Sequence, residues 1–265
     1  MINVRENVKR LYSFWKGIRS REISASLAFY FITGFTPLLC LALFFCGRQF
    51  PSELFDGSAF FGSVFDFAKT VNTAAVQKVA SGGAILLLTS VYSSVSLFAK
   101  FKKCGEILYK FEEKRKPLRL RIVSLAYVGI TVVLFTAVGF FFFLIKSLSS
   151  GAAYKIMVGA ISVALVFCLL VILNMLVCPY KLSIREVWGG AAITLAIWMI
   201  ICAVFGFYLD HFANYERAYG AFAGVFSFIF FVYFLMQAFT FGVAYNILKL
   251  GRLKPRTVRN GLLRP

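Results

Sequence analysis

Six long apolar runs constrain this chain more than any other feature of its sequence. They cover residues 23–46, 82–99, 122–145, 156–177, 187–209 and 218–248. A membrane-spanning helix needs roughly 20 apolar residues to cross a hydrocarbon core about 30 Å thick. Lipid offers no hydrogen-bond partner to backbone N–H and C=O groups, so runs of this length form helices. The sequence therefore predicts an all-α, polytopic membrane protein with six transmembrane helices and amphipathic interfacial helices.

The composition of the chain supports this class. The sequence is 60% hydrophobic and only 15% charged, with a mean hydropathy of +0.80. A soluble domain usually carries about 25% charged residues. The apolar runs do not alternate with polar residues at period two, so membrane-spanning strands are not expected.

The distribution of basic residues predicts the orientation. Of 29 Lys and Arg residues, 23 lie in the N-terminal arm, the second-to-third connection, the fourth-to-fifth connection and the C-terminal tail, and 6 lie in the other connections. Counting acidic residues, the two sides carry 23 − 6 = +17 and 6 − 5 = +1. The positive-inside rule then places both termini in the cytoplasm. Basic residues beside spans meet anionic lipid, so we expect membrane lipids as partners and no nucleic acid.

Three regions follow from this pattern: a cytoplasmic interfacial amphipathic arm (1–22), a six-helix transmembrane domain (23–248) and a basic cytoplasmic tail (249–265). In the arm, apolar residues recur at helical spacing with Lys and Arg between them: Val4, Val8, Leu11, Trp15 and Ile18. Such a helix can lie on the inner leaflet or dock against the protein. The helical spacing of apolar residues within 47–81 predicts a second amphipathic helix. The second span is expected to continue as a basic helix, 100–116, that Pro117 ends.

Two sets of polar residues lie within the first two spans or at the end of the second. Thr89, Ser93, Ser96 and Lys100 form one helical stripe with Tyr92 beside it. The stripe either packs helices together or lines a polar cavity. In the first span, Pro37 removes the N–H that would bond the Thr33 carbonyl, which predicts a kink. The candidate cavity or hinge residues are Tyr30, Thr33, Pro37, Thr89, Tyr92, Ser93 and Ser96.

A cluster of lysines follows the second span. It is a candidate contact for lipid head groups or for an envelope or cytoplasmic protein partner, and it comprises Lys100, Lys102, Lys103 and Lys110. The chain contains no Walker A loop, GxSxG, HExxH or CxxC motif, and no ionisable residue at the middle of a span. We therefore predict no catalytic residue, no cofactor and no metal site, and we expect that the protein is not an enzyme.

Several stretches together resemble the YihY/BrkB family of bacterial inner-membrane proteins, once labelled ribonuclease BN-like. They are "ASLAFYFITGFTPLL" (25–39), "SGGAILLLTSVYSSVSLFAKFKKCGEILYKF" (81–111), "PYKLSIREVWGGAAITLAIW" (179–198), "YLDHFANYERAYGAFAGV" (208–225) and "FFVYFLMQAFTFGVAYN" (230–246). The resemblance covers about residues 20–250. It implies six helices in the bacterial cytoplasmic membrane and does not imply a biochemical activity.

The resemblance also separates matching from departing positions. The candidate outer-loop motif comprises Asn214, Tyr215, Tyr219 and Gly220, whereas His211, the only histidine, does not match the family pattern. Ala221, Phe231 and Ala244 stand where the family commonly has Ser, Trp and Glu. A reaction or ion site that depends on that Glu in relatives would be altered in this chain.

Three functions remain open from the sequence. The first is transport or handling of a lipid or another amphiphile, since hydroxyl stripes, basic clusters and the absence of a midplane charge suit such a cargo. The second is a non-catalytic scaffold that docks a partner through the basic helix 100–116. The third is a membrane-embedded enzyme, which lacks support from any recognisable set of nucleophile, base or metal ligand.

The six-span topology gives the first test. Reporter fusions after Lys116 and after Arg217 should report opposite sides of the membrane, because an odd number of spans separates them. The thiol of Cys104 should likewise be reached only from the cytoplasm. Two fusions that report the same side would contradict six spans.

Overall fold

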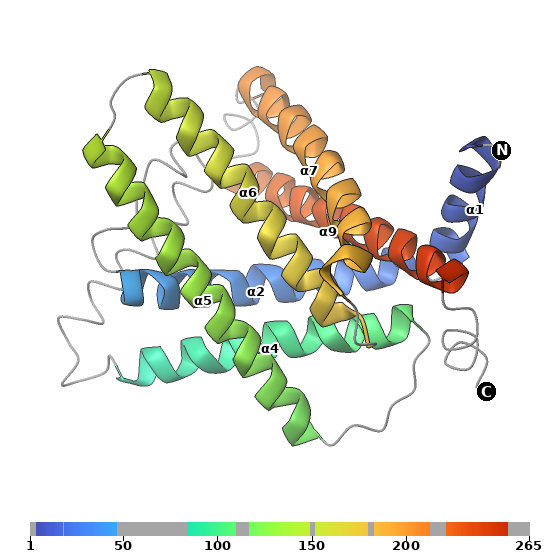
Figure 1. Ribbon diagram of the computed structural model, residues 1–265, viewed down its shortest axis with the longest axis horizontal. Helices are drawn as coiled ribbons and strands as arrows, with labels where there is room; N and C mark the ends of the chain where they lie inside the picture. Colours follow the sequence, from blue (N-terminus) through green and yellow to red (C-terminus); the bar gives the residue numbers. More distant parts are fainter. Residues whose placement is uncertain are drawn as a thin grey trace. The chain divides into compact units, whose positions relative to one another are not determined.

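The computed structural model describes residues 4–17, 19–46, 84–109, 117–148, 152–179, 183–212 and 221–253. Within these ranges all regular secondary structure is α-helical (Figure 1). The helices are α1 (Val4–Gly17), α2 (Ser20–Cys46), α4 (Ala84–Leu108), α5 (Pro117–Leu148), α6 (Ala152–Val177), α7 (Ile184–Phe212) and α9 (Ala221–Leu253). The predicted all-α class is confirmed for this part of the chain.

Four of the described helices are long and apolar enough to cross a membrane. The crossing segments are Leu120–Ala137 in α5, Gly159–Val177 in α6, Ile184–Tyr208 in α7 and Phe226–Leu250 in α9. Helices α2 and α4 cover the first two predicted spans, but neither reaches that threshold over its described residues. Six spans therefore stay a prediction. The amphipathic helix predicted within 47–81 lies outside the described residues.

Local sequence signals set the ends of two helices. The backbone N–H of Ser183 donates to Glu186 Oε2 at 2.9 Å, which is one of the two bonds of a capping box, just before α7 begins at Ile184. The prediction that Pro117 ends a helix was wrong, because α4 ends at Leu108 and Pro117 is the first residue of α5. The first turn of a helix has no use for the N–H that proline lacks, so proline begins helices well. The described helical part of segment 100–116 is 100–108.

The chain divides into two compact units. Unit 1 comprises Met1–Phe31, Lys100–Lys114 and Leu170–Pro265, and unit 2 comprises Ile32–Ala99 and Arg115–Leu169. Unit 1 therefore holds α1, α7 and α9 entire, together with one end each of α2, α4 and α6. Each unit is described by itself below.

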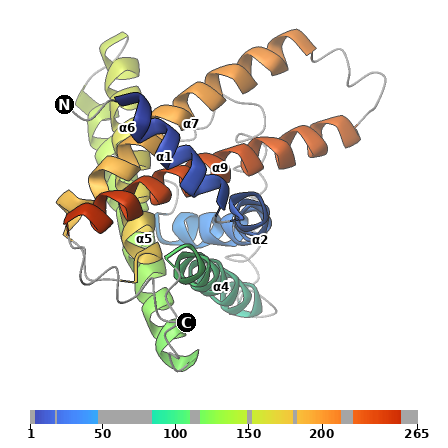
Figure 2. The ribbon, with the colours of Figure 1, turned by 90° about the vertical axis from the view of Figure 1, so that its right-hand side faces the viewer.

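Unit 1 is built on the crossing of α7 and α9, which lie side by side in Figures 1 and 2. A Cβ atom added to Gly190 on α7 would collide with the carbonyl oxygen of Gly242 on α9. One added to Gly242 would collide with the Thr194 hydroxyl and would lie 2.5 Å from the Gly190 oxygen. Two glycines facing each other thus let the two backbones approach closely, as small residues do between membrane helices.

The side chain of Asn246 closes this crossing. Its oxygen accepts from the Gly190 N–H at 2.8 Å, and its amide donates to Asn174 Oδ1 at 3.0 Å and to the Val187 carbonyl at 3.2 Å. Asn246 has no exposed surface, and Asn174 is only 2% exposed. One buried amide therefore connects α9 to both α6 and α7. Asn174 thus bonds another helix, whereas Gln237 bonds Tyr233 within α9.

The other end of unit 1 brings α1 against α9. Leu11 is buried, and the ring of Trp15 packs edge-on against Phe241 with centroids 5.9 Å apart. The structure thus shows α1 docked on the protein, and its position on the inner leaflet stays a prediction.

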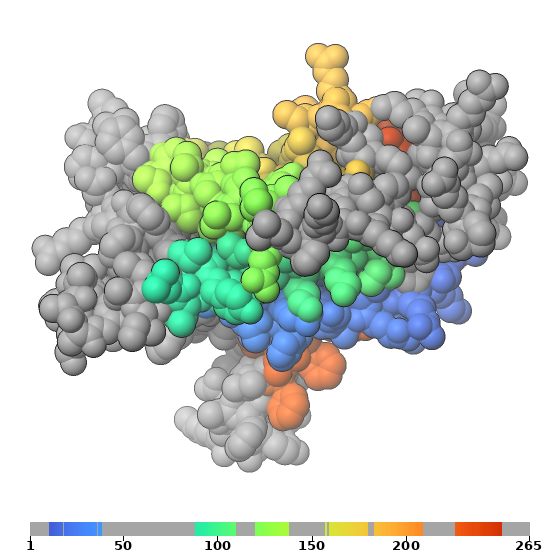
Figure 3. Space-filling model, turned by 90° about the horizontal axis from the view of Figure 1, so that it is seen from below, coloured from blue at the N-terminus to red at the C-terminus, as the bar shows by residue number. Residues whose placement is uncertain are grey.

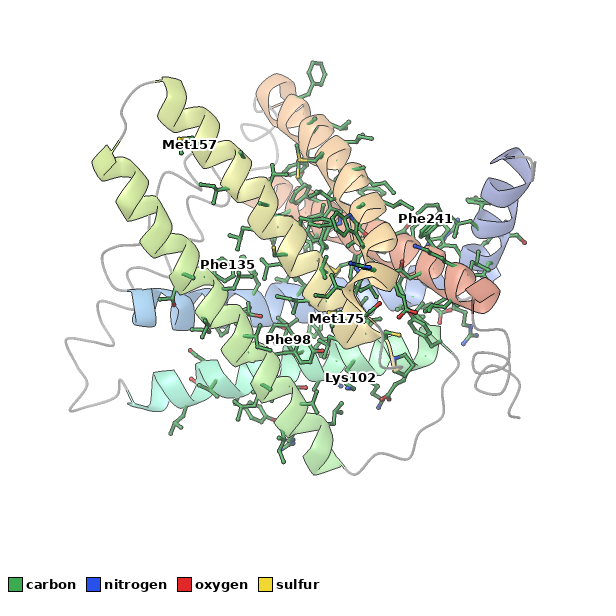
Figure 4. The ribbon with its side chains drawn as sticks, in the orientation of Figure 1. Phe98, Lys102, Phe135, Met157, Met175 and Phe241 are labelled. Carbon is green, nitrogen blue, oxygen red and sulfur yellow. The ribbon has the colours of Figure 1, made fainter. Side chains whose placement is uncertain are left out.

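Unit 2 packs parts of α2, α4 and α5 together. Phe98 of α4 stacks on Tyr127 of α5 with ring centroids 6.4 Å apart. Phe135, about two turns further along α5, is also buried (Figure 4). The buried hydroxyls of Ser124 and Thr131 donate to carbonyls one turn earlier in α5, so these polar groups are satisfied within their own helix. Side chains of α2 and α4 lie next to each other on the face seen in Figure 3.

Candidate functional site

The predicted site residues fall on two helices or outside the described residues. Tyr30, Thr33 and Pro37 lie on α2, and Thr89, Tyr92, Ser93, Ser96, Lys100, Lys102 and Lys103 lie on α4. The candidate outer-loop residues Asn214, Tyr215, Tyr219 and Gly220 lie outside the described residues, as does Lys110. His211 belongs to the last turn of α7, since that helix ends at Phe212.

Within unit 2, α4 supplies the hydrogen bond that Pro37 removes from α2. Helix α2 continues through Pro37, which has no N–H to donate to the carbonyl of Thr33 one turn earlier. The hydroxyl of Ser93 on α4 donates to that carbonyl oxygen at 3.3 Å. A serine from a neighbouring helix therefore satisfies the backbone group that the proline frees. The predicted kink itself is not tested by this contact.

The same stretch of α2 lies close against α4. A Cβ atom added to Gly34 would come within 2.6 Å of Leu97 Cβ, one turn beyond Ser93. Leu97 is 4% exposed and Gly34 is buried. Ser93 thus sits where two helices pack tightly, which favours the packing interpretation of this residue over the cavity interpretation.

The rest of the hydroxyl stripe behaves differently from Ser93. Thr89 and Tyr92 are exposed, Tyr92 by 64%. The hydroxyl of Ser96 donates to the Tyr92 carbonyl at 2.8 Å within α4. The structure therefore does not bring the predicted stripe together as one polar surface: Ser93 joins α2, and the others face outward or bond their own helix.

The lysines also separate into two kinds. Lys100 Nζ lies 4.8 Å from the centre of the Tyr30 ring, which is cation–π geometry between α4 and α2 within unit 1. Lys103 is exposed, whereas Lys102, labelled in Figure 4, is 8% exposed. Adjacent helical residues point about 100° apart, so Lys102 cannot share the surface of Lys103. A surface contact for lipid or partner is therefore available at Lys100 and Lys103 and not at Lys102.

Cys104 is a poorer topology reporter than the sequence suggested. It is 8% exposed, and the next residue, Gly105, abuts the carbonyl oxygen of Val177 at the end of α6. Burial raises the pKa of the Cys104 thiol from 9.0 to about 11, and the nearby charges of Lys100 and Lys103 lower it by less. The reactive thiolate is scarce at neutral pH, so reaction with thiol reagents should be slow from either side.

The contact that sequence reasoning missed is the cluster of Asn174, Gly190 and Asn246 in unit 1. Only a local signal was available: Gly242 and Asn246 are one turn apart on α9, as Gly190 and Thr194 are on α7. Periodicity places such pairs on one face of a helix but does not say which helix they meet. Among the described residues, no group of three or more His, Cys, Asp or Glu side chains is placed to hold a metal ion.

Several long apolar helices, held together by close glycine contacts and buried amides, define a multi-pass α-helical membrane protein. The chain belongs to the BrkB family, since the family model described as virulence factor BrkB matches residues 12–259. The family resemblance seen in the sequence is thereby confirmed.

One curated relative matches a short stretch. Over 45 residues the chain is 42% identical to the ribonuclease-like protein YfkH of Bacillus subtilis (strain 168), and the match covers 17% of this chain and 16% of that protein. No solved structure matches the chain.

The bond between Ser93 and the Thr33 carbonyl predicts a thermodynamic coupling. Ser93→Ala should destabilise the protein by about 1 kcal/mol, since a backbone carbonyl loses its donor. Pro37→Ala supplies an N–H to the same carbonyl, so in that background the penalty of Ser93→Ala should largely disappear. Thermal unfolding of the two single variants and the double variant measures this coupling.

Ser96→Ala is the matched control, because that hydroxyl bonds only its own helix backbone in the contacts described. It should change stability little in either background. Equal penalties for Ser93→Ala with and without Pro37 would contradict the role assigned to this hydroxyl.

Proposed function

We propose that this protein handles a lipid or another amphiphile whose anionic head group is bound by Lys100 and Lys103 beside Tyr30. The cation–π contact of Lys100 with Tyr30 is the observation that carries the proposal. It holds one ammonium group in place, so less side-chain freedom is lost when an anion binds. Lys103 is exposed three residues along α4, on nearly the same side of the helix.

Both lysines lie in the part of α4 that belongs to unit 1. An anionic head group bound between them would meet two positive charges at once. Each basic side chain near a membrane surface attracts anionic lipid by about 1 kcal/mol.

The proposed setting is a bacterial cytoplasmic membrane with both termini in the cytoplasm. Family membership supports a membrane setting, and the bias of basic residues towards one side supports the orientation. In this setting the lysines of α4 face the inner leaflet. We also propose that the protein has no catalytic activity. The ribonuclease-like name of the Bacillus relative is not extended to this chain, since the match covers 45 residues.

A scaffold that docks a protein partner is the second candidate. Ile107 is 55% exposed one turn after Lys103, so the basic end of α4 presents an apolar and a charged residue together. A partner with an acidic and apolar surface would fit this pair. The burial of Lys102 leaves fewer charges for such a partner than the sequence suggested.

The two candidates are separated by lipid movement in vesicles. Purified protein in vesicles should move a fluorescent phosphatidylglycerol between leaflets. Lys100→Gln combined with Lys103→Gln should slow this movement by roughly 10- to 30-fold, because two attractions of about 1 kcal/mol each are lost. Tyr30→Leu should slow it less, since only the positioning of Lys100 is lost.

Arg185→Gln is the control, because Arg185 is an exposed basic residue on α7 outside the proposed site. It should leave the rate unchanged. Wild-type protein that moves no anionic lipid, together with a protein partner that is lost in Lys103→Gln and Ile107→Ala, would favour the scaffold.

A further inference from the structure

The docking of α1 depends on one tryptophan. Trp15 Nε1 donates to the Thr240 hydroxyl at 3.2 Å, and the Trp15 ring meets Phe241 edge-on. Leu11, one turn earlier, is 9% exposed. Figure 2 shows α1 across α9. Leu11 and Trp15, two residues of the predicted apolar stripe, are therefore part of the surface by which α1 docks.

Thr240 joins α1 to α2 as well as to α9. Its hydroxyl donates to the Gln237 carbonyl at 2.9 Å, and Ser24 Oγ lies 3.1 Å from it. A hydroxyl has one proton and two lone pairs, so with its proton on Gln237 it accepts from Trp15 and Ser24. Thr240 has no exposed surface. Movement of α1 away from α9 would break the bond from Trp15 and leave the other two in place.

The elbow between α1 and α2 is held in an unusual backbone conformation. Arg19 has a φ of 52°, which side chains other than glycine rarely adopt. Its carbonyl accepts from the N–H groups of Glu22 and Ile23 at 3.1 and 3.3 Å, so the first turn of α2 maintains it. Gly17 ends α1, and an added Cβ there would meet nothing within 4 Å. Residues in sparsely populated conformations collect in switch regions, and this one lies where α1 would pivot.

The same helix is suited to an anionic lipid surface. Its residues 4–17 contain four basic residues and one acidic residue. Tyr12, whose ring centroid lies 6.1 Å from that of Trp15, is 56% exposed, and Lys16 is exposed. Amphipathic helices with basic polar faces bind anionic membranes by inserting their apolar stripe between head groups. The stripe of Leu11 and Trp15 can pack on α9 or insert into lipid, but it cannot do both at once.

We infer that α1 is a two-position helix. In one position it is docked on α9 through Trp15 and Thr240, and in the other it is released about the Arg19 elbow onto a membrane surface rich in anionic lipid. The charge of the surrounding leaflet sets the balance between the positions, because only the released position lets the apolar stripe enter lipid beside the basic residues. The two interpretations of the N-terminal arm are then two states of one helix.

Spin-label distances test this directly. Nitroxides at Ser13→Cys on α1 and Lys249→Cys on α9 are placed in the full chain with the native cysteines replaced by alanine. The protein is measured in symmetric vesicles of phosphatidylcholine alone and of phosphatidylcholine mixed with phosphatidylglycerol. We expect one short distance in the first and a second, longer distance in the mixture. High salt should reduce the population with the longer distance, since salt screens exposed charges.

Thr240→Val removes the acceptor for Trp15 at nearly constant shape. It should raise the ratio of released to docked α1 roughly two- to tenfold in either lipid, as expected for loss of one hydrogen bond. Thr240→Ser keeps the hydroxyl and should restore the wild-type distribution. Thr136→Val, which removes a threonine hydroxyl bonded to its own helix in α5, should have no effect.

One distance that is unchanged by lipid charge and by Thr240→Val would overturn the inference. A population with the longer distance that appears in Thr240→Val but does not change with lipid charge would overturn the proposal that lipid charge sets the balance. Thermal unfolding of the same samples identifies any variant that fails to fold, and Thr240→Ser then provides the comparison.

Discussion

The close approach of Gly190 and Gly242 is the contact on which the rest of unit 1 depends. Two facing glycines bring the backbones of α7 and α9 together, and only at this separation can Asn246 reach the Gly190 N–H at 2.8 Å. Lipid tails are as apolar as the side chains, so there is little hydrophobic free energy to gain when two helices associate in a membrane. Helices there associate through close packing and hydrogen bonds. The Asn246 amide then extends the contact to Asn174 of α6.

A fixed α9 gives the peripheral parts of unit 1 their positions. The carbonyl of Leu235 on α9 accepts from Trp198 of α7, and the Thr240 hydroxyl, whose own proton is on the Gln237 carbonyl, accepts from Ser24 of α2. Through Ser24 these bonds hold α2, and six residues further along α2 stands Tyr30, whose ring carries the ammonium group of Lys100. Helix α9 thus positions both the proposed head-group site and the surface on which α1 docks.

Sequence patterns predicted the elements of this fold better than their contacts. The apolar run 187–209 predicted α7 to within three residues at each end, and at its start the helix extends beyond the run to the hydrogen bond between Ser183 and Glu186. Closeness in the sequence grouped Lys100, Lys102 and Lys103, yet a helix turns by about 100° per residue, which sends Lys102 into the protein. The partner of Asn174 could not be predicted, because it lies 72 residues away in the chain and is fixed only by how helices pack.

The stability of Gly190→Ala, compared with that of Gly206→Ala, tests the central role of the α7–α9 contact. Both glycines lie on α7, but an added Cβ meets the Gly242 backbone at position 190 and nothing within 4 Å at position 206. Thermal unfolding should show Gly190→Ala destabilised by roughly 1–3 kcal/mol, the usual range for overpacking. Gly206→Ala should be neutral or stabilised by up to about 1 kcal/mol, because alanine favours helices. Equal stability of the two variants would contradict the account.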